Sequence, residues 1–297
     1  LSTNKRKTTI KTRVIAENKH QLRIDEEETS PILQVEEFLK LTISLINDID
    51  VIILQDYNKG VLTHEIIEEV IATANKKGIP TIVDPKKLNF NSYKNCTIFK
   101  PNLAEIKAGL KIDFDVNNIA EIEKATEKLR EQLSAQGVLL TLSERGICIN
   151  YEKEFKHTPV FKRNIIDVSG AGDTVIAVAS LCLASNMNYN DLSVLSSLAG
   201  GIVCEEVGVI PINKKKLNQQ SLLAWQVSRA GSKKGLWAVF VSSHLHKIFA
   251  SQHHVIHLTL QLQLRRGRPR ARHCCGRNQI SLSRLHSGHS RCKHQSY

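Results

Sequence analysis

Short apolar runs rich in β-branched residues alternate along this chain with longer segments in which apolar residues recur every three or four positions. The short runs predict strands at residues 50–54, 81–83, 97–99 and 138–141. The longer segments predict helices at residues 31–46, 66–74, from 103, 117–136, 171–185 and 192–206, with Pro31 in the first turn of the first helix. Strands joined through helices lie parallel, so the pattern predicts a doubly wound α/β fold with a mostly parallel central sheet flanked by helices.

Period-two alternation predicts two hairpins beside this core. One pairs residues 8–15 with 21–25 around a polar turn at Asn18 and Lys19, and the other pairs 147–151 with 155–157. No apolar run approaches the roughly 18 residues of a membrane span, so we expect no membrane partner.

Single cysteines lie within apolar runs of residues 1–212. They are Cys96, Cys148, Cys182 and Cys204. Isolated thiols in apolar surroundings are typical of reduced core residues and not of a disulfide framework. The cysteine pattern therefore predicts a cytoplasmic location.

Charge divides the chain in two. Its 297 residues carry a formal net charge of +12, yet residues 213–297 contain no Asp or Glu, and all 29 acidic residues precede them. We therefore predict a folded domain at 1–212 and a basic tail at 213–297 that is disordered or read from another frame. The alternative is a nucleic-acid-binding arm, because clustered Arg265–Arg270 would attract phosphates. The scattered Cys and His of the tail lack zinc-finger spacing.

The segment Ser169-Gly170-Ala171-Gly172-Asp173 opens an apolar helix and suits phosphoryl transfer. Gly170 and Gly172 permit a tight turn, and unpaired amides at the helix start favour an anion such as phosphate. Asp173 would repel that phosphate, so its position makes sense if it accepts the proton of the attacking hydroxyl. The alternative is an ordinary helix start at which Ser169 or Asp173 caps the amides.

Two more motifs follow predicted strands. Asn102 and Glu105 can share one side of a helix start, where an amide and a carboxylate suffice to organise a hydrated Mg²⁺. The alternative is a capping box, in which the two side chains satisfy helix-terminal amides. The metal site and the capping box are compatible with each other. Lys86 follows Asp84 and Pro85 on a rigid turn from which its ammonium can reach a phosphate, and a solvated surface lysine is the alternative.

The chain contains four motifs in the following order: Asp84-Pro85-Lys86, Lys100-Pro101-Asn102-Leu103-Ala104-Glu105, Thr141-Leu142-Ser143-Glu144-Arg145-Gly146 and Gly170-Ala171-Gly172-Asp173. This is the order found in ribokinase-like (phosphofructokinase-B) sugar kinases, which the chain resembles over about residues 7–212. The resemblance implies a ribokinase-like fold, ATP and Mg²⁺ as cofactors, Asp173 as catalytic base, and an anion hole at Gly170, Ala171 and Gly172.

The same resemblance implies further binding residues. Those expected near ATP are Lys86, Thr141, Ser143, Gly146 and Ser197, and those expected at the substrate cleft are Asp56 and Lys59. Two positions depart from the family: Gln55 stands where a small residue is expected, and Ser197 where an Asn near the adenine is expected. These departures concern affinity more than reaction type.

Within the family, Lys11–Ile15, Gln21–Asp25 and Asp56–Gly60 resemble kinases of D-glycero-β-D-manno-heptose 7-phosphate, which serve lipopolysaccharide core synthesis. The resemblance implies transfer from ATP to the anomeric hydroxyl, giving the 1,7-bisphosphate. A ribose or fructose phosphate is the alternative acceptor, a non-enzymatic nucleic-acid-binding protein is the alternative class, and a homodimer is left open. Because the chain begins at Leu1 and nothing before Lys11 resembles the family's Gly-Gly-x-x-Asn helix start, we expect a fragment with an incomplete acceptor site.

Overall fold

The computed structural model describes residues 2–3, 6, 9–16, 19–228, 255–258, 278–279 and 282–285. The helices are α1 (Val35–Leu45), α2 (His64–Lys76), α3 (Leu103–Leu110), α4 (Ile119–Leu133), α5 (Ala171–Ala184), α6 (Tyr189–Val203) and α7 (Lys214–Ser228), with 3₁₀ turns at Ile46–Asp48 and Ser143–Arg145. The strands are β1 (Ser2–Thr3), β2 (Ile10–Ala16), β3 (Lys19–Glu26), β4 (Val51–Gln55), β5 (Thr81–Asp84), β6 (Ile98–Phe99), β7 (Gly137–Thr141), β8 (Ile147–Tyr151), β9 (Glu154–Thr158), β10 (Val255–Leu258), β11 (Asn278–Gln279) and β12 (Leu282–Leu285).

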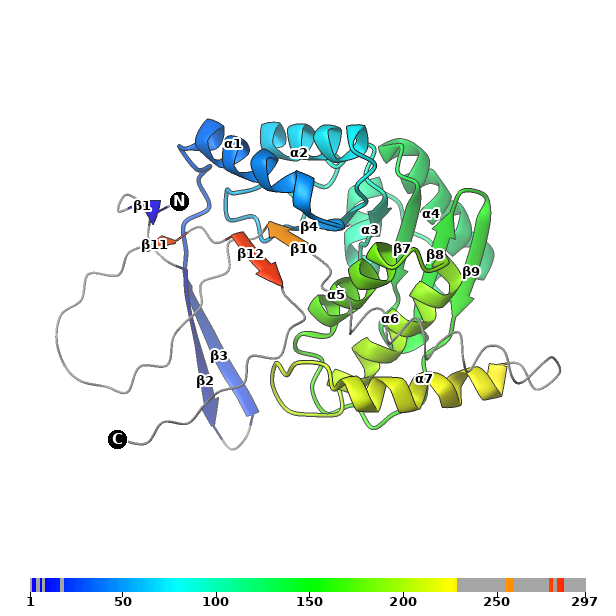
Figure 1. The fold of residues 1–297 in the computed structure, drawn as a ribbon. Helices are drawn as coiled ribbons and strands as arrows, with labels where there is room; N and C mark the ends of the chain where they lie inside the picture. Colours follow the sequence, from blue (N-terminus) through cyan, green and yellow to red (C-terminus); the bar gives the residue numbers. More distant parts are fainter. Residues whose placement is uncertain are drawn as a thin grey trace, which may run out of the picture.

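A central sheet has the strand order β12-β10-β4-β5-β6-β7-β8-β9. Strands β4 to β7 are parallel neighbours, and β8 and β9 continue the sheet as antiparallel strands. On the other side, β10 is parallel to β4 and β12 is antiparallel to β10. The predicted mostly parallel α/β architecture is confirmed (Figure 1).

Both faces of the sheet are covered by helices. Ile52 and Leu54 of β4 pack with α1 to α4, whereas Val51 and Ile53 of the same strand pack with α5 to α7. Figure 1 shows α1 and α2 on one side of the sheet and α5, α6 and α7 on the other. A strand buried on both faces is apolar at every position, which explains the short unbroken apolar runs in the sequence.

Two helix starts differ from the prediction. Helix α1 begins at Val35 and not at Pro31, because the backbone N–H of Ile32 bonds the Gly60 carbonyl at 2.9 Å and buries Ile32, which holds this segment outside the helix. Helix α6 begins at Tyr189 instead of near residue 192, because the Asn188 side chain accepts the Asp191 N–H and caps the helix there.

The region predicted to be a tail begins with helix α7. Its Leu217 is fully buried, Ser221 one turn later is also buried, and Lys216 forms a 2.7 Å ion pair with Glu205 after α6. Spacing of i and i+4 puts the two buried residues on one helix face, which explains why this part is helical and not irregular. Most of the tail lies outside the described residues, so its predicted disorder or altered frame stays a prediction.

The hairpin β2–β3 lies beside the sheet as a separate two-stranded unit. In its register Val14 is opposite Leu22, and Ile24 is opposite Thr12, so the apolar residues share one face. Ile10, Val14, Leu22 and Ile24 are 43–54% exposed there. Within the described residues, no helix combines the length and apolar character needed to cross a membrane.

Candidate active site

The carboxyl ends of β4 to β7 meet at one edge of the sheet. Strand β4 ends at Gln55, β5 ends at Asp84, Lys100 follows β6, and β7 ends at Thr141. Ligands of open α/β sheets bind at this edge. The sequence motifs therefore gather where this architecture places a site, although they are distant in the chain.

Helix α5 brings Asp173 to this edge. The side-chain amide of buried Gln55 and, at 3.3 Å, the hydroxyl of Tyr57 both donate to Asp173 Oδ1. Asp173 is exposed to solvent, and it receives these bonds from residues more than a hundred positions earlier in the chain. The predicted catalytic carboxylate thus lies beside the end of β4.

The start of α5 has no side-chain cap. Gly170 is the N-cap with φ +80°. The N–H and the hydroxyl of Thr174 both donate to the Gly170 carbonyl, each at 2.9 Å. The alternative of Ser169 or Asp173 as the cap is not observed. The Ser169 N–H instead donates to Asp167 Oδ1 at 2.9 Å. The Ala171 N–H donates to the Val168 carbonyl at 3.2 Å, and no side chain caps the first turn of α5. An uncapped helix start of this kind suits an anion.

Asn102, Glu105 and Lys86 come together as a small polar cluster. Asn102 is the N-cap of α3 and forms the expected capping box: its side chain accepts the Glu105 N–H, and Glu105 Oε2 accepts the Asn102 N–H, both at 2.9 Å. Lys86 Nζ lies 2.6 Å from Glu105 Oε1. Partial burial lowers the pKa of Lys86, but the hydrogen bond to Glu105 and nearby carboxylates outweigh this and raise it, so the ammonium stays charged.

A buried ion pair lies at the ends of the neighbouring strands β5 and β6. Lys100 Nζ lies 3.0 Å from Asp84 Oδ1, and their side chains are only 4% and 11% exposed. The sequence motif contained Lys100, but no role was predicted for it. A lysine directly after a buried apolar strand could have predicted a buried ion pair, because a buried charge requires a charged partner.

Asp56 and Lys59, predicted at the substrate cleft, have partners elsewhere. Asp56 is buried and accepts bonds from Tyr93 (2.8 Å) and Asn89 (3.0 Å) on the side of the sheet that carries α1 to α4. Lys59 pairs with Glu27. The structure does not bring either side chain to Asp173; it brings the intervening Tyr57 there instead.

The residues predicted near ATP follow β7 or lie on α6. Thr141 pairs with Asn102 as an isolated parallel bridge, which joins the two motifs. Ser143 is exposed with φ +54°. Gly146 has φ +95°, and a Cβ added there would lie 2.2 Å from the Thr158 carbonyl oxygen. Ser197 is half-buried on α6, one turn before Gly200, which packs close to Val175 on α5.

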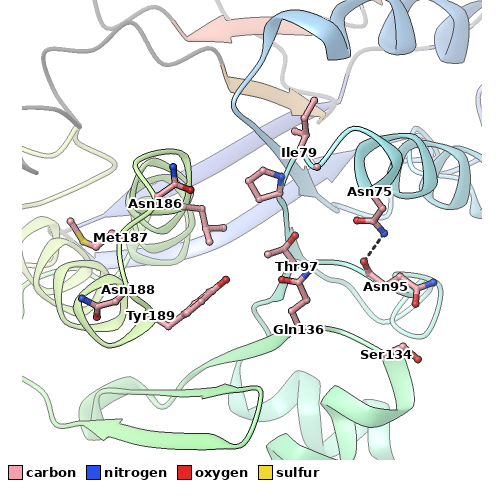
Figure 2. A pocket seen from close by; sticks show the side chains of 13 residues that line it. Asn75, Ile79, Asn95, Thr97, Ser134, Gln136, Asn186, Met187, Asn188 and Tyr189 are labelled. Carbon is pink, nitrogen blue, oxygen red and sulfur yellow. Dashed lines mark hydrogen bonds between the residues drawn. The ribbon is translucent and has the colours of Figure 1, made fainter.

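A cavity of about 780 Å³ lies at the opposite edge of the sheet. Pro80, Thr97 and Gln136, which immediately precede β5, β6 and β7, form part of its lining. Figure 2 shows amide side chains such as Asn186 on one side and Asn75 on the other. None of its lining residues is charged, so it lacks the groups that phosphoryl transfer requires.

Comparisons with known proteins agree with this geometry. The family model of pfkB family carbohydrate kinases matches residues 1–216. "Bifunctional protein HldE" of Campylobacter jejuni subsp. jejuni serotype O:2 is 37% identical over 208 residues, which is 70% of this chain and 44% of that protein. The protein of the same name from Nitratiruptor sp. is 35% identical over 216 residues, covering 72% of this chain and 45% of that protein. The chain thus spans about half the length of these relatives.

Solved structures show the same fold at low sequence identity. Phosphofructokinase-2 from Escherichia coli, in complex with potassium, matches with a TM-score of 0.64 and 17% identity over 74% of this chain and 71% of that chain. Ribokinase of Arabidopsis thaliana, complexed with ribose and ATP, matches with a TM-score of 0.56 and 18% identity over 69% and 66%. The predicted ribokinase-like resemblance is confirmed, and the chain belongs to the pfkB family of carbohydrate kinases.

Proposed function

We propose that this chain transfers the γ-phosphoryl group of ATP to the anomeric hydroxyl of D-glycero-β-D-manno-heptose 7-phosphate, giving the 1,7-bisphosphate for lipopolysaccharide core synthesis. The observation that carries the proposal is the place of Asp173, beside the uncapped start of α5 at the carboxyl edge of the sheet. Relatives named HldE support the heptose acceptor over a ribose or fructose phosphate.

Each part of the α5 turn has one role in this reaction. Asp173 accepts the proton of the acceptor hydroxyl as its oxygen attacks phosphorus. The amides of Gly170, Ala171 and Gly172 stabilise the charge on the transferring group, because a helix start already points them at that position. The Ala171 N–H, which donates to the Val168 carbonyl at 3.2 Å, would exchange that bond for one to the phosphoryl group.

Asn102 and Glu105 are the residues that would hold Mg²⁺ through its water shell. Among the described residues no three His, Cys, Asp or Glu gather as a metal site, and the oxygen pair on α3 fits an ion that keeps most of its waters. When bound, Mg²⁺ neutralises charge on the ATP phosphates. Lys86, now paired with Glu105, lies within reach of the same region and would exchange that partner for a phosphate.

The remaining predicted contacts complete the proposal. Thr141, Ser143 and Gly146 after β7 and Ser197 on α6 would contact ATP, and Asp56 and Lys59 would shape the substrate side through the loop that they support.

We place the reaction in the cytoplasm, because ATP is available there and the described cysteines are unpaired and buried. Burial raises the pKa of Cys96 and of Cys148 to about 12, so both stay as inert thiols.

The test incubates the purified chain, alone and with an N-terminal extension taken from an HldE relative, with Mg²⁺, ATP and a candidate acceptor. We expect ³¹P NMR to show a new anomeric phosphate with heptose 7-phosphate, and little product with fructose 6-phosphate or ribose 5-phosphate. Transfer to the latter two alone would refute the acceptor and leave the kinase assignment intact. Equal transfer by wild type and Asp173→Asn would refute the role of Asp173.

A further inference from the structure

Two side chains from the end of β4 hold one oxygen of Asp173. Gln55 Nε2 and Tyr57 Oη both donate to Oδ1, the latter at 3.3 Å. Gln55 is 3% exposed and Tyr57 is half-buried, so both donors reach a surface carboxylate from the sheet side. Residue 56 between them points to Tyr93, on the other side of the sheet.

The second oxygen of Asp173 has a different environment. Among the described residues, no donor bonds Oδ2, although an ionised carboxylate accepts about four hydrogen bonds. Two donors withdraw electron density from Oδ1 and restrict rotation of the carboxylate about its Cβ–Cγ bond. Oδ2 is therefore the better proton acceptor, and its direction is fixed.

Both donors keep their protons under working conditions. Burial, the charges of Asp173 and Asp84, and the bond to Asp173 raise the pKa of Tyr57 above its ordinary value, so the phenol remains a donor. A glutamine amide does not titrate at all. Neither residue caps α5, because Gly170 occupies that position.

From this geometry we propose that Gln55 and Tyr57 are positioning residues, which bind Asp173 Oδ1 so that Oδ2 alone meets the acceptor hydroxyl. The inference rests on the proposed function of Asp173 as the base. It also gives a role to Gln55, which departs from the small residue expected from family resemblance. Positioning of this kind contributes to the rate, since a misplacement of about 1 Å can cost on the order of a hundredfold.

One arm of the test uses the chain as it is and needs no turnover. The five tyrosines are labelled with ¹³C at Cζ, and the Tyr57 signal is identified by its loss in Tyr57→Phe. In Asp173→Asn at about pH 7 we expect the Tyr57 Cζ chemical shift to change, because the hydrogen bond that its hydroxyl donates to the carboxylate is weakened. Asp113→Asn, which neutralises an exposed carboxylate after α3, is the matched control and should leave the signal unchanged.

The second arm measures phosphoryl transfer. Gln55→Met and Tyr57→Phe should each lower kcat about tenfold and leave the KM for ATP within about twofold, because they misplace the base without touching the nucleotide. In the Asp173→Asn background the same changes should have no further effect. Thr97→Val, which removes the buried hydrogen bond that the Thr81 N–H donates to Thr97 Oγ1 at the opposite edge, should reduce stability without lowering kcat.

The outcomes separate the two hypotheses. Transfer that depends on Asp173 but is unaffected by Gln55→Met and Tyr57→Phe overturns the positioning role and leaves the proposed function standing. Equal losses with and without Asp173 also overturn it, because the residues then act through the fold. If no form transfers phosphate while the Tyr57 signal still responds to Asp173→Asn, the proposed function has failed, and the positioning role fails with it.

Discussion

Replacing Lys100 by Met should destabilise the protein far more than replacing the lysine of an exposed ion pair. Lys100 and Asp84 lie 3.0 Å apart and are 4% and 11% exposed at their side chains. At an effective dielectric constant of about 20, such a pair attracts by roughly 5 kcal/mol before desolvation is counted. Removal of the lysine leaves the carboxylate of Asp84 buried without a partner.

We therefore expect Lys100→Met to lower the free energy of unfolding by about 3–5 kcal/mol, a large share of the roughly 5–15 kcal/mol typical of a domain. The double change Lys100→Met with Asp84→Asn should recover most of this loss, because it leaves no unpaired buried charge. Urea denaturation at pH 7 measures both, with the slope of the transition checked for constancy. Lys107→Met, at an exposed pair with Asp113, is the control and should have little effect.

The reasoning about a buried pair is refuted if Lys100→Met costs less than about 1 kcal/mol, or if the double variant is as unstable as the sum of the single ones. In either case water or another group would have to compensate Asp84. The pair would then not be the support of the strand edge that its burial indicates.

Four further outcomes are expected. Asp173→Asn should lower kcat by about 10²–10⁴-fold with ATP binding nearly unchanged, measured by ADP release and by calorimetry. Gly146→Ala should cost at least about 1–3 kcal/mol in urea denaturation, because φ is +95° and the added Cβ would lie 2.2 Å from a carbonyl oxygen. The hydrogen bond from Lys216 lowers the pKa of Glu205 below its ordinary value of 4.5. The ion pair therefore stabilises the docking of α7 fully above pH 4.5, and this stabilisation is lost as the pH falls through the lowered pKa. Proteolysis near α7 should increase on acidification. Leu22→Lys on the exposed apolar face of hairpin β2–β3 should shift sedimentation towards monomer if two copies pair there, and no shift would exclude that face.

The order of strands and helices was predictable because its signals are local. A strand such as Val51–Gln55 is a short apolar run, and α2 shows its apolar stripe within thirteen residues. The start of α1 was not predictable, since Pro31 resembles a first-turn proline. Only the contact of Ile32 with Gly60, distant in sequence, excludes the segment from the helix.

The candidate site was predictable as far as its residues belong to motifs. Asn102 and Glu105 are three positions apart, and their capping box follows directly from that spacing. The pairing of Lys86 with Glu105 joins the ends of two strands and needs the sheet order to be known. The contacts of Gln55 and Tyr57 with Asp173 need in addition the placement of α5 across β4, which no local pattern encodes.

The arrangement of charge at the strand edge explains why these non-local contacts matter. Asp56, Asp84 and Glu105 would together repel the phosphates of ATP if they were bare. Each is instead engaged: Asp56 by Tyr93 and Asn89, Asp84 by Lys100, and Glu105 by Lys86. Asp173 is left as the exposed carboxylate among these four, held at Oδ1 by neutral donors that leave its charge in place. Among these four carboxylates, the one left exposed beside the start of α5 is therefore Asp173, where the mechanism proposed above needs a proton acceptor.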